Sequence, residues 1–261
     1  VVHVVDSLAG SGGAENRLVD EVLALAERFD QRLVRLFERD FLDVRLAEGG
    51  VPVIALGFKA AGAGRWWPAA ARRLVRELRH DPPDVIHTSL FAGNLVGQLA
   101  GARLGIPVVS TFNRTGELEL QRALQPGVSS WKGRTLQAIG RRVARGGDVH
   151  YRAVGDYART TNCAAMGLPF EACTVVPRGV RIDPAAVAAA TRGPFGVPAD
   201  APLFVNVARI VPEKAQHLLV EAFARVREQV PDARLAIAGE VGPALPAVQR
   251  AVERTGVGES V

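Results

Sequence analysis

The sequence contains few cysteines, few lysines and no long apolar run. Its two cysteines, Cys163 and Cys173, match no metal-ligand spacing and are too few for a disulfide framework. We therefore expect reduced thiols in a cytoplasmic protein. No uninterrupted apolar stretch reaches the roughly 18–20 residues that a membrane-spanning helix needs. These absences exclude zinc modules, small disulfide-rich secreted domains and helical membrane proteins.

Lysine occurs only at positions 59, 132 and 214, so arginine carries most of the positive charge. The 32 Lys and Arg residues exceed the 27 Asp and Glu residues and give a formal net charge of +5. This balance is compatible with nucleic acid, anionic lipid or nucleotide phosphates as partners. No nucleic-acid recognition motif accompanies it, so we predict no nucleic-acid partner.

Strand-like apolar runs alternate with helical patterns along the 261 residues. The runs in the first two thirds cover residues 1–5, 32–37, 51–56, 84–88, 108–112, 149–154 and 174–177. Such alternation is typical of parallel sheets with helices on both faces. An Ala-, Pro- and Gly-rich stretch begins at residue 183. We predict an α/β fold of two Rossmann-like, doubly wound domains, 1–182 and 183–261, the second incomplete because it shows only two strands.

The stretch from Pro202 to Gly239 contains a complete strand–helix–strand pattern. Apolar runs at 203–208 and 235–238 flank a helix with an apolar face, made of Leu218, Leu219, Ala222, Phe223 and Val226. Arg209 and Lys214 follow the first strand on a short loop. Ligands of open parallel sheets bind beyond the carboxyl ends of the strands. Two cations there, beside the start of a helix, predict a phosphate site.

A glycine-rich loop follows the first predicted strand. Gly10, Gly12 and Gly13 precede a helix that we expect to start near Ala14 or Glu15. Backbone N–H groups of such a loop can approach a phosphate closely, although a tight turn alone would explain the glycines equally well. The spacing is not G-x-G-x-x-G, which argues against a dinucleotide-dependent dehydrogenase.

Several segments resemble the GT-B glycosyltransferases of family 4, the retaining group 1 enzymes. These are RIVPEK at 209–214 before LLVEAF, GGAE at 12–15, and PPDVIHT at 82–88 with VVSTFN at 108–113. The resemblance implies that Arg209 and Lys214 hold the diphosphate of a nucleotide-sugar donor and stabilise charge in the transition state. It also implies donor contacts at Gly12, Gly13 and Gly239. It implies no metal and no cofactor besides the donor.

The acceptor side of the site follows from the same resemblance. The family pattern has a histidine where this sequence has Asn113, and asparagine cannot take a proton, which argues against a general base there. We expect His87 to end its strand at the same edge of the sheet, either as a structural group or beside the acceptor. The segment 114–127 is a candidate acceptor-side lid.

A basic helical pattern follows at residues 129–148. Its arginines and Lys132 form either an ordinary solvated face or a contact with an anionic membrane surface. The segment 153–183 resembles the hinge of the family, with Gly155 and Arg178 in place of a serine and an asparagine. The family's Glu-(seven residues)-Glu segment has no counterpart here. We therefore expect a C-terminally truncated chain that is a poor enzyme by itself.

Two functions remain open from the sequence. The first is transfer of a sugar, with retention, from a UDP-, GDP- or ADP-type donor to a glycan, lipid-linked or small-molecule acceptor. Such a transferase would serve cell-envelope, polysaccharide or glycolipid synthesis, in the cytoplasm or in peripheral contact with the inner face of the membrane. The alternative is a non-catalytic nucleotide- or anion-binding Rossmann-like module, which Asn113 and the missing glutamates favour.

Overall fold

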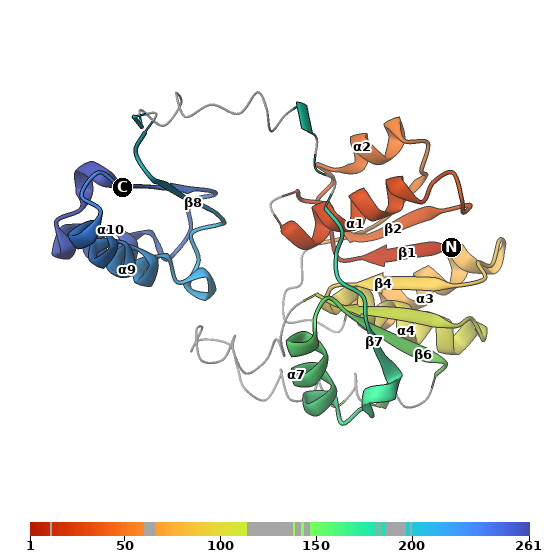
Figure 1. Ribbon diagram of the computed structural model, residues 1–261. Helices are drawn as coiled ribbons and strands as arrows, with labels where there is room; N and C mark the ends of the chain where they lie inside the picture. Colours follow the sequence, from red (N-terminus) through yellow and green to blue (C-terminus); the bar gives the residue numbers. More distant parts are fainter. Residues whose placement is uncertain are drawn as a thin grey trace. The chain divides into compact units, whose positions relative to one another are not determined.

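The computed structural model describes residues 1–10, 12–59, 66–113, 138, 142–143, 147–180, 182, 184–185, 197–198 and 200–261. The predicted lid at 114–127 and most of the basic helix at 129–148 lie outside these residues. The chain forms two compact units, Val1–Gly179 (unit 1) and Val180–Val261 (unit 2) (Figure 1). The division falls three residues before the boundary that we predict after residue 182.

Unit 1 is built on a seven-stranded sheet in which every neighbouring pair is parallel. Its strands are β1 (Val2–Val5), β2 (Arg32–Phe37), β3 (Val53–Phe58), β4 (Ile86–Ser89), β5 (Val108–Phe112), β6 (Val149–Ala153) and β7 (Cys173–Val175). Their order in the sheet is β3-β2-β1-β4-β5-β6-β7. From β1 the chain adds strands first on one side, β2 and β3, and then on the other, β4 to β7. This change of side, between β1 and β4, is the topological switch point at which doubly wound sheets bind ligands.

Helices cover both faces of this sheet, as the alternating pattern predicts. They are α1 (Gly13–Ala24), α2 (Asp43–Glu48), α3 (Trp66–Arg79), α4 (Phe91–Leu104) and α7 (Asp156–Met166). Figure 1 shows α1 and α2 on one side and α3, α4 and α7 on the other. No helix in the described ranges is long and apolar enough to cross a bilayer.

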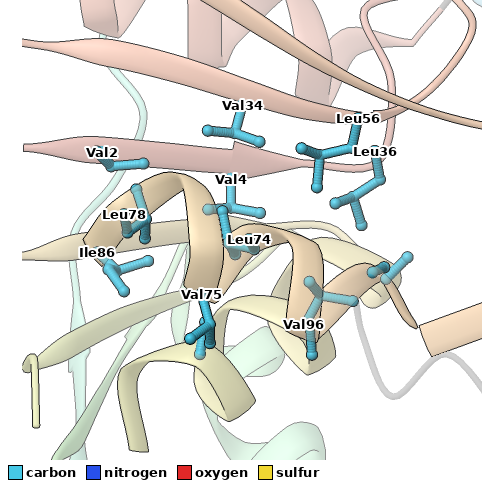
Figure 2. Packing of buried hydrophobic residues seen from close by; sticks show 14 of the residues in the cluster. Val2, Val4, Val34, Leu36, Leu56, Leu74, Val75, Leu78, Ile86 and Val96 are labelled. Carbon is cyan, nitrogen blue, oxygen red and sulfur yellow. The ribbon is translucent and has the colours of Figure 1, made fainter. Parts of the chain in front are cut away.

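The main core of unit 1 lies between the sheet and the α3–α4 pair (Figure 2). Val2 and Val4 of β1 enter this core, whereas Val5 joins a second core under α1 and α2. This alternation follows from the two-residue period of a strand. On α3, Leu74, Val75 and Leu78 are buried, and Trp67 packs against the cluster while only partly buried.

A row of three glycines lets α4 approach the sheet closely. A Cβ atom on Gly93 would lie 2.8 Å from the Val4 carbonyl oxygen, and one on Gly97 would lie 2.3 Å from Thr88 Cγ2. Gly101 is equally crowded by Val108. Since real Cβ atoms do not approach other atoms this closely, larger residues at these positions would push α4 off the sheet.

Unit 2 contains two parallel strands, as predicted, β8 (Leu203–Val207) and β9 (Arg234–Ala238). Helices α9 (Gln216–Gln229) and α10 (Leu245–Thr255) complete it. The predicted inner face of α9 is partly wrong, because Leu218 and Ala222 are exposed and Val220 is buried instead. The helix packs against α10, and this contact turns a different stripe inward.

Candidate functional site

The loop that leaves β8 carries the two predicted phosphate ligands, Arg209 and Lys214. The Ile210 N–H donates to the Glu240 carbonyl at 2.9 Å, which continues the parallel pairing of β8 and β9 past their ends. Residues Pro212–Lys214 then form a single 3₁₀ turn before α9 begins. The loop is therefore fixed by backbone bonds on both sides of Arg209.

Within the described part of the chain, neither cation of this loop has an acidic partner. Arg209 is partly buried and Lys214 is exposed. Among the described residues, no carboxylate lies within ion-pair distance of either side chain. Their positive charge is therefore available to an anion that approaches the carboxyl end of β8.

Gly239 and Gly242 pack directly against the backbone of this loop. A Cβ atom on Gly239 would lie 2.0 Å from the Ala208 carbonyl oxygen, and one on Gly242 would lie 2.5 Å from the Ile210 carbonyl oxygen. The predicted donor contact at Gly239 stays a prediction. What the structure establishes is that a side chain at Gly239 or Gly242 would displace the loop carrying Arg209.

Gln216 is a functional candidate that the sequence did not reveal. Its side chain is fully buried, and its Nε2 donates to the Arg209 carbonyl at 2.9 Å. Ala215, which joins Lys214 to this residue, has a left-handed backbone with φ 51°, which is unusual for a residue other than glycine. The sequence offers one signal for this role, which is that Gln216, a polar residue, stands at the first position of α9, a helix with an apolar face.

In unit 1, Gly12 and Gly13 lie at the switch point, beyond the end of β1. Gly12 caps α1 and Gly13 is its first residue, one position before the predicted start. Apart from the chain neighbours and the backbone of α1 itself, no atom of the described residues lies within 4 Å of where a Gly13 Cβ would be, and Gly13 is exposed. The Glu15 carboxylate, which accepts from Ser7 Oγ at 2.6 Å, turns back toward Gly12.

The predicted place of His87 at the end of a strand is wrong. It is the second residue of β4, which continues to Ser89, and only 8% of its surface is exposed. Its Nδ1 lies 2.9 Å from His3 Nδ1, and its Nε2 lies 2.8 Å from Thr111 Oγ1. With both ring nitrogens occupied inside the sheet, His87 is a structural group here.

The hydrogen bonds fix how the two histidines share their protons. Gln31 Nε2 donates to the Val22 carbonyl, so Gln31 Oε1 accepts from His3 Nε2. A neutral His3 must then accept at Nδ1 from His87, whose Nε2 accepts from Thr111. Burial lowers the pKa of His3 to about 4 and holds that of His87 well below 6.5. Both rings are therefore neutral at physiological pH.

Asn113, the first residue after β5, binds an arginine. Its Oδ1 accepts from Arg178 Nη2, and Arg178 Nη1 donates to the Ala14 carbonyl at 3.3 Å. The sequence pattern marks Arg178 only as a replacement within the hinge. The structure shows that it ties the end of β5 to the first turn of α1.

Within the described ranges, no group of three or more His, Cys, Asp or Glu side chains could hold a metal ion. The residues divide between the units: Gly12, Gly13, His87 and Asn113 belong to unit 1, and Arg209, Lys214 and Gly239 to unit 2. Each unit thus places cations and backbone donors beyond the carboxyl ends of parallel strands. This arrangement suits an anionic ligand such as a phosphate.

A family comparison identifies this architecture. The model described as Glycosyltransferase Family 4 matches residues 11–184. The chain belongs to glycosyltransferase family 4. A second model, described as Glycosyl transferases group 1, matches residues 188–261. The family predicted from RIVPEK, GGAE and the strand motifs is therefore confirmed.

Named relatives of this family 4 chain include two curated transferases. The GDP-mannose-dependent alpha-(1-6)-phosphatidylinositol monomannoside mannosyltransferase of Mycolicibacterium smegmatis is 37% identical over 125 residues, 46% of this chain and 32% of the relative. The D-inositol 3-phosphate glycosyltransferase of Kineococcus radiotolerans is 29% identical over 151 residues, 57% and 34% of the two chains. The matched stretches thus span about a third of these relatives.

A solved structure shares the fold. HepE from Anabaena, crystallised with UDP and glucose, superposes with a TM-score of 0.73 at 20% identity, over 100% of this chain and 67% of HepE. At this identity the similarity speaks for the fold alone. Together with the parallel sheets, it confirms the predicted Rossmann-like GT-B fold.

Proposed function

We propose that this chain belongs to a glycosyltransferase that moves a hexosyl group, with retention, from a nucleotide-diphosphate sugar to an acceptor hydroxyl. The observation that carries the proposal is the pair of cations Arg209 and Lys214, which have no carboxylate partner among the described residues, on a loop held by backbone bonds beyond a parallel strand of a family 4 chain. The M. smegmatis relative uses a GDP-sugar by its name, and HepE was solved with UDP. These names support a UDP- or GDP-linked donor.

In this function Arg209 and Lys214 neutralise the charge that grows on the departing diphosphate. The bond between the anomeric carbon and the β-phosphate oxygen breaks, and a bond to the acceptor oxygen forms. Preorganised cations stabilise such developing charge without a metal ion. Gly12, Gly13 and Gly239 would contribute close backbone contacts with the donor, and no cofactor besides the donor is needed.

The acceptor would bind to unit 1. His87 is buried, and Asn113 cannot accept a proton. Neither residue then serves as a general base, so the acceptor proton passes to the departing phosphate oxygen. Asn113 keeps the capacity to hydrogen-bond a sugar hydroxyl. The relatives act, by their names, on a phosphatidylinositol mannoside and on D-inositol 3-phosphate, which supports a glycan-like, lipid-linked or small polyol acceptor.

The proposal also places the protein in the cytoplasm, with peripheral contact at the inner face of the membrane. Cys163 and Cys173 are buried free thiols, which suits a reducing compartment. The lipid-linked substrate in the name of the M. smegmatis relative supports the membrane contact. A non-catalytic binding module is less well supported, since both curated relatives are named transferases.

Calorimetric titration of the 261-residue chain with UDP and with GDP tests the proposal. Arg209→Ala and Lys214→Ala should each weaken binding of the preferred diphosphate by about 10- to 100-fold, as expected for a lost charge-assisted hydrogen bond. Arg250→Ala, on the exposed surface of α10, is the matched control and should bind as the parent does. Unchanged binding in both loop variants would remove these residues from the site.

A further inference from the structure

Unit 1 holds a group of guanidinium side chains on the face of its sheet that α1 covers. Arg152 of β6 forms an ion pair with Glu21 of α1, and only 13% of its side chain is exposed. Arg178 contacts the first turn of α1 through the Ala14 carbonyl. Burial lowers the pKa of Arg178; Glu21 opposes this shift, while Arg152 and Arg17 add to it. Two guanidinium groups, Arg152 and Arg178, therefore lie near the Glu21 carboxylate, whereas Arg17 is itself paired with Asp20.

Three polar atoms on this side of the sheet lack hydrogen-bond partners among the described residues. They are Ser89 Oγ, Arg152 Nε and Asn113 Nδ2, each shielded from solvent. Ser89, Thr111 and Arg152 are register partners on β4, β5 and β6, so their side chains leave the same face. Asn113 follows Thr111 by two residues and shares that face. Buried polar groups are rarely left unsatisfied, and such a group calls for an explanation.

All three orphaned atoms can donate a hydrogen bond. Arg178 adds further donors, because a guanidinium has five N–H groups and the described residues accept from it at two places, Ala14 and Asn113. Two guanidinium groups and donors that lack partners among the described residues, on one face of the sheet, are matched by an oxyanion. A phosphate monoester offers three terminal oxygens and about −1.5 to −2 charges, whereas a carboxylate offers two oxygens and a single charge.

We propose that Arg178, Arg152 and Asn113, here called the Arg178 cluster, form a binding site for a phosphate-class oxyanion in unit 1. The Arg178 cluster belongs to unit 1 and the Arg209–Lys214 loop to unit 2. That the bound anion is part of the acceptor rests on the proposed function, in which unit 1 binds the acceptor. That the Arg178 cluster binds inorganic phosphate does not depend on the proposed function.

The position of the Arg178 cluster supports a role in the reaction. Asn113 and Arg178 lie at the carboxyl ends of β5 and β7, which is the sheet edge that doubly wound folds use for ligands. Gly13, which is exposed, lies one residue from Ala14, which Arg178 contacts. An oxyanion held here would fix its parent molecule beside the Gly12–Gly13 loop.

Two-dimensional ¹H–¹⁵N NMR of the 261-residue chain tests the site directly. Inorganic phosphate, added at constant ionic strength against chloride, should shift the Asn113 side-chain amide and the Gly13 backbone amide with a saturating curve. Arg178→Gln should weaken this binding at least about tenfold. Arg103→Gln, an exposed arginine of α4, is the matched control and should bind normally. Equal shifts with chloride, or an unchanged curve in Arg178→Gln, would overturn the proposal.

Asn113→Asp gives a second variant that protects the test from a folding failure. Aspartate still accepts from Arg178, so the tie to α1 remains, but the Nδ2 donor is replaced by a negative oxygen. Phosphate binding, followed at Gly13, should then be lost while the melting temperature is kept or raised. Retained phosphate affinity in this variant would contradict the site as firmly as the first result.

A titration in the presence of saturating UDP or GDP distinguishes a phosphate of the acceptor from a phosphate of the donor. An acceptor-side site predicts that glycerol 3-phosphate still shifts Asn113 when UDP or GDP is bound. It also predicts that Arg178→Gln leaves the UDP and GDP affinities within about twofold. Competition between the nucleotide and glycerol 3-phosphate would assign the cluster to the donor phosphates instead and overturn the acceptor assignment. Failure of nucleotide binding at Arg209 and Lys214 would refute the proposed function without touching the phosphate curve.

Discussion

Lowering the pH from about 7.5 to about 5 should destabilise unit 1 through its two buried histidines. Burial lowers the pKa of His3 from 6.5 to about 4 and also lowers that of His87. Both residues stay neutral in the folded state but take up protons in the unfolded chain below about pH 6.5. Stability is therefore highest above pH 6.5 and is lost as the pH falls toward 4.

The size of the loss follows from the displacement of the His3 pKa. A shift from 6.5 to about 4 corresponds to ~3.4 kcal/mol when complete, and at about pH 5 roughly 2 kcal/mol of this is expressed. His87 adds a loss of the same sign. The raised pKa of Asp43 acts in the opposite direction, because the folded state then holds its proton more tightly. We expect a net loss of at least ~2 kcal/mol.

Urea unfolding followed by tryptophan fluorescence measures this loss, since Trp66 and Trp67 pack against the core of unit 1. His3→Gln should reduce the difference between the two pH values by about 2 kcal/mol. His80→Asn removes an exposed histidine and should leave the difference unchanged. If the parent chain is equally stable at both pH values, or more stable at pH 5, the buried neutral pair is refuted, whatever the variants do.

Three further substitutions test how the loops and α4 are held. Gln216→Leu should remove one of the two hydrogen bonds that the Arg209 carbonyl accepts, since the Val211 N–H also donates to it at 3.0 Å. We expect a cost of about 0.5–1.5 kcal/mol, weaker UDP or GDP binding and faster hydrogen exchange over residues 209–214; unchanged exchange would refute the positioning role. Gly239→Ala should destabilise unit 2 by about 2 kcal/mol or more, whereas Gly258→Ala, where a Cβ has ordinary contacts, should cost less than about 1 kcal/mol in the same melt. Gly97→Ala should lower the unfolding free energy of unit 1 by about 1–3 kcal/mol, and a neutral result would show that α4 does not need the glycine.

The fold could be predicted because each element carries a local pattern. The strand at 108–112 has the predicted bounds, since its strand-like apolar run is visible in the sequence alone. The inner face of α9 was less predictable. Leu218 and Val220 are both apolar, and only packing against α10 decides which one is buried.

From the sequence, site residues could be predicted only where they directly follow a recognisable strand. Arg209 and Lys214 stand out because they follow an apolar strand in the sequence, although β8 is largely exposed in the structure. The bond from Gln216 to Arg209 depends instead on how the loop folds back. His87 shows the limit clearly. Its contact with His3 joins residues 84 positions apart, and such pairing is set by sheet register, which no local pattern specifies.

The central claim is that Arg209 and Lys214 bind the diphosphate of the donor, and the most direct measurement isolates that group. The affinities of UDP and UMP, and of GDP and GMP, should be compared in the parent chain and in Arg209→Gln/Lys214→Gln. The account predicts that the parent binds the preferred diphosphate at least about tenfold more tightly than its monophosphate. The double variant should bind the two equally. A double variant that keeps the full preference for the diphosphate would contradict the account.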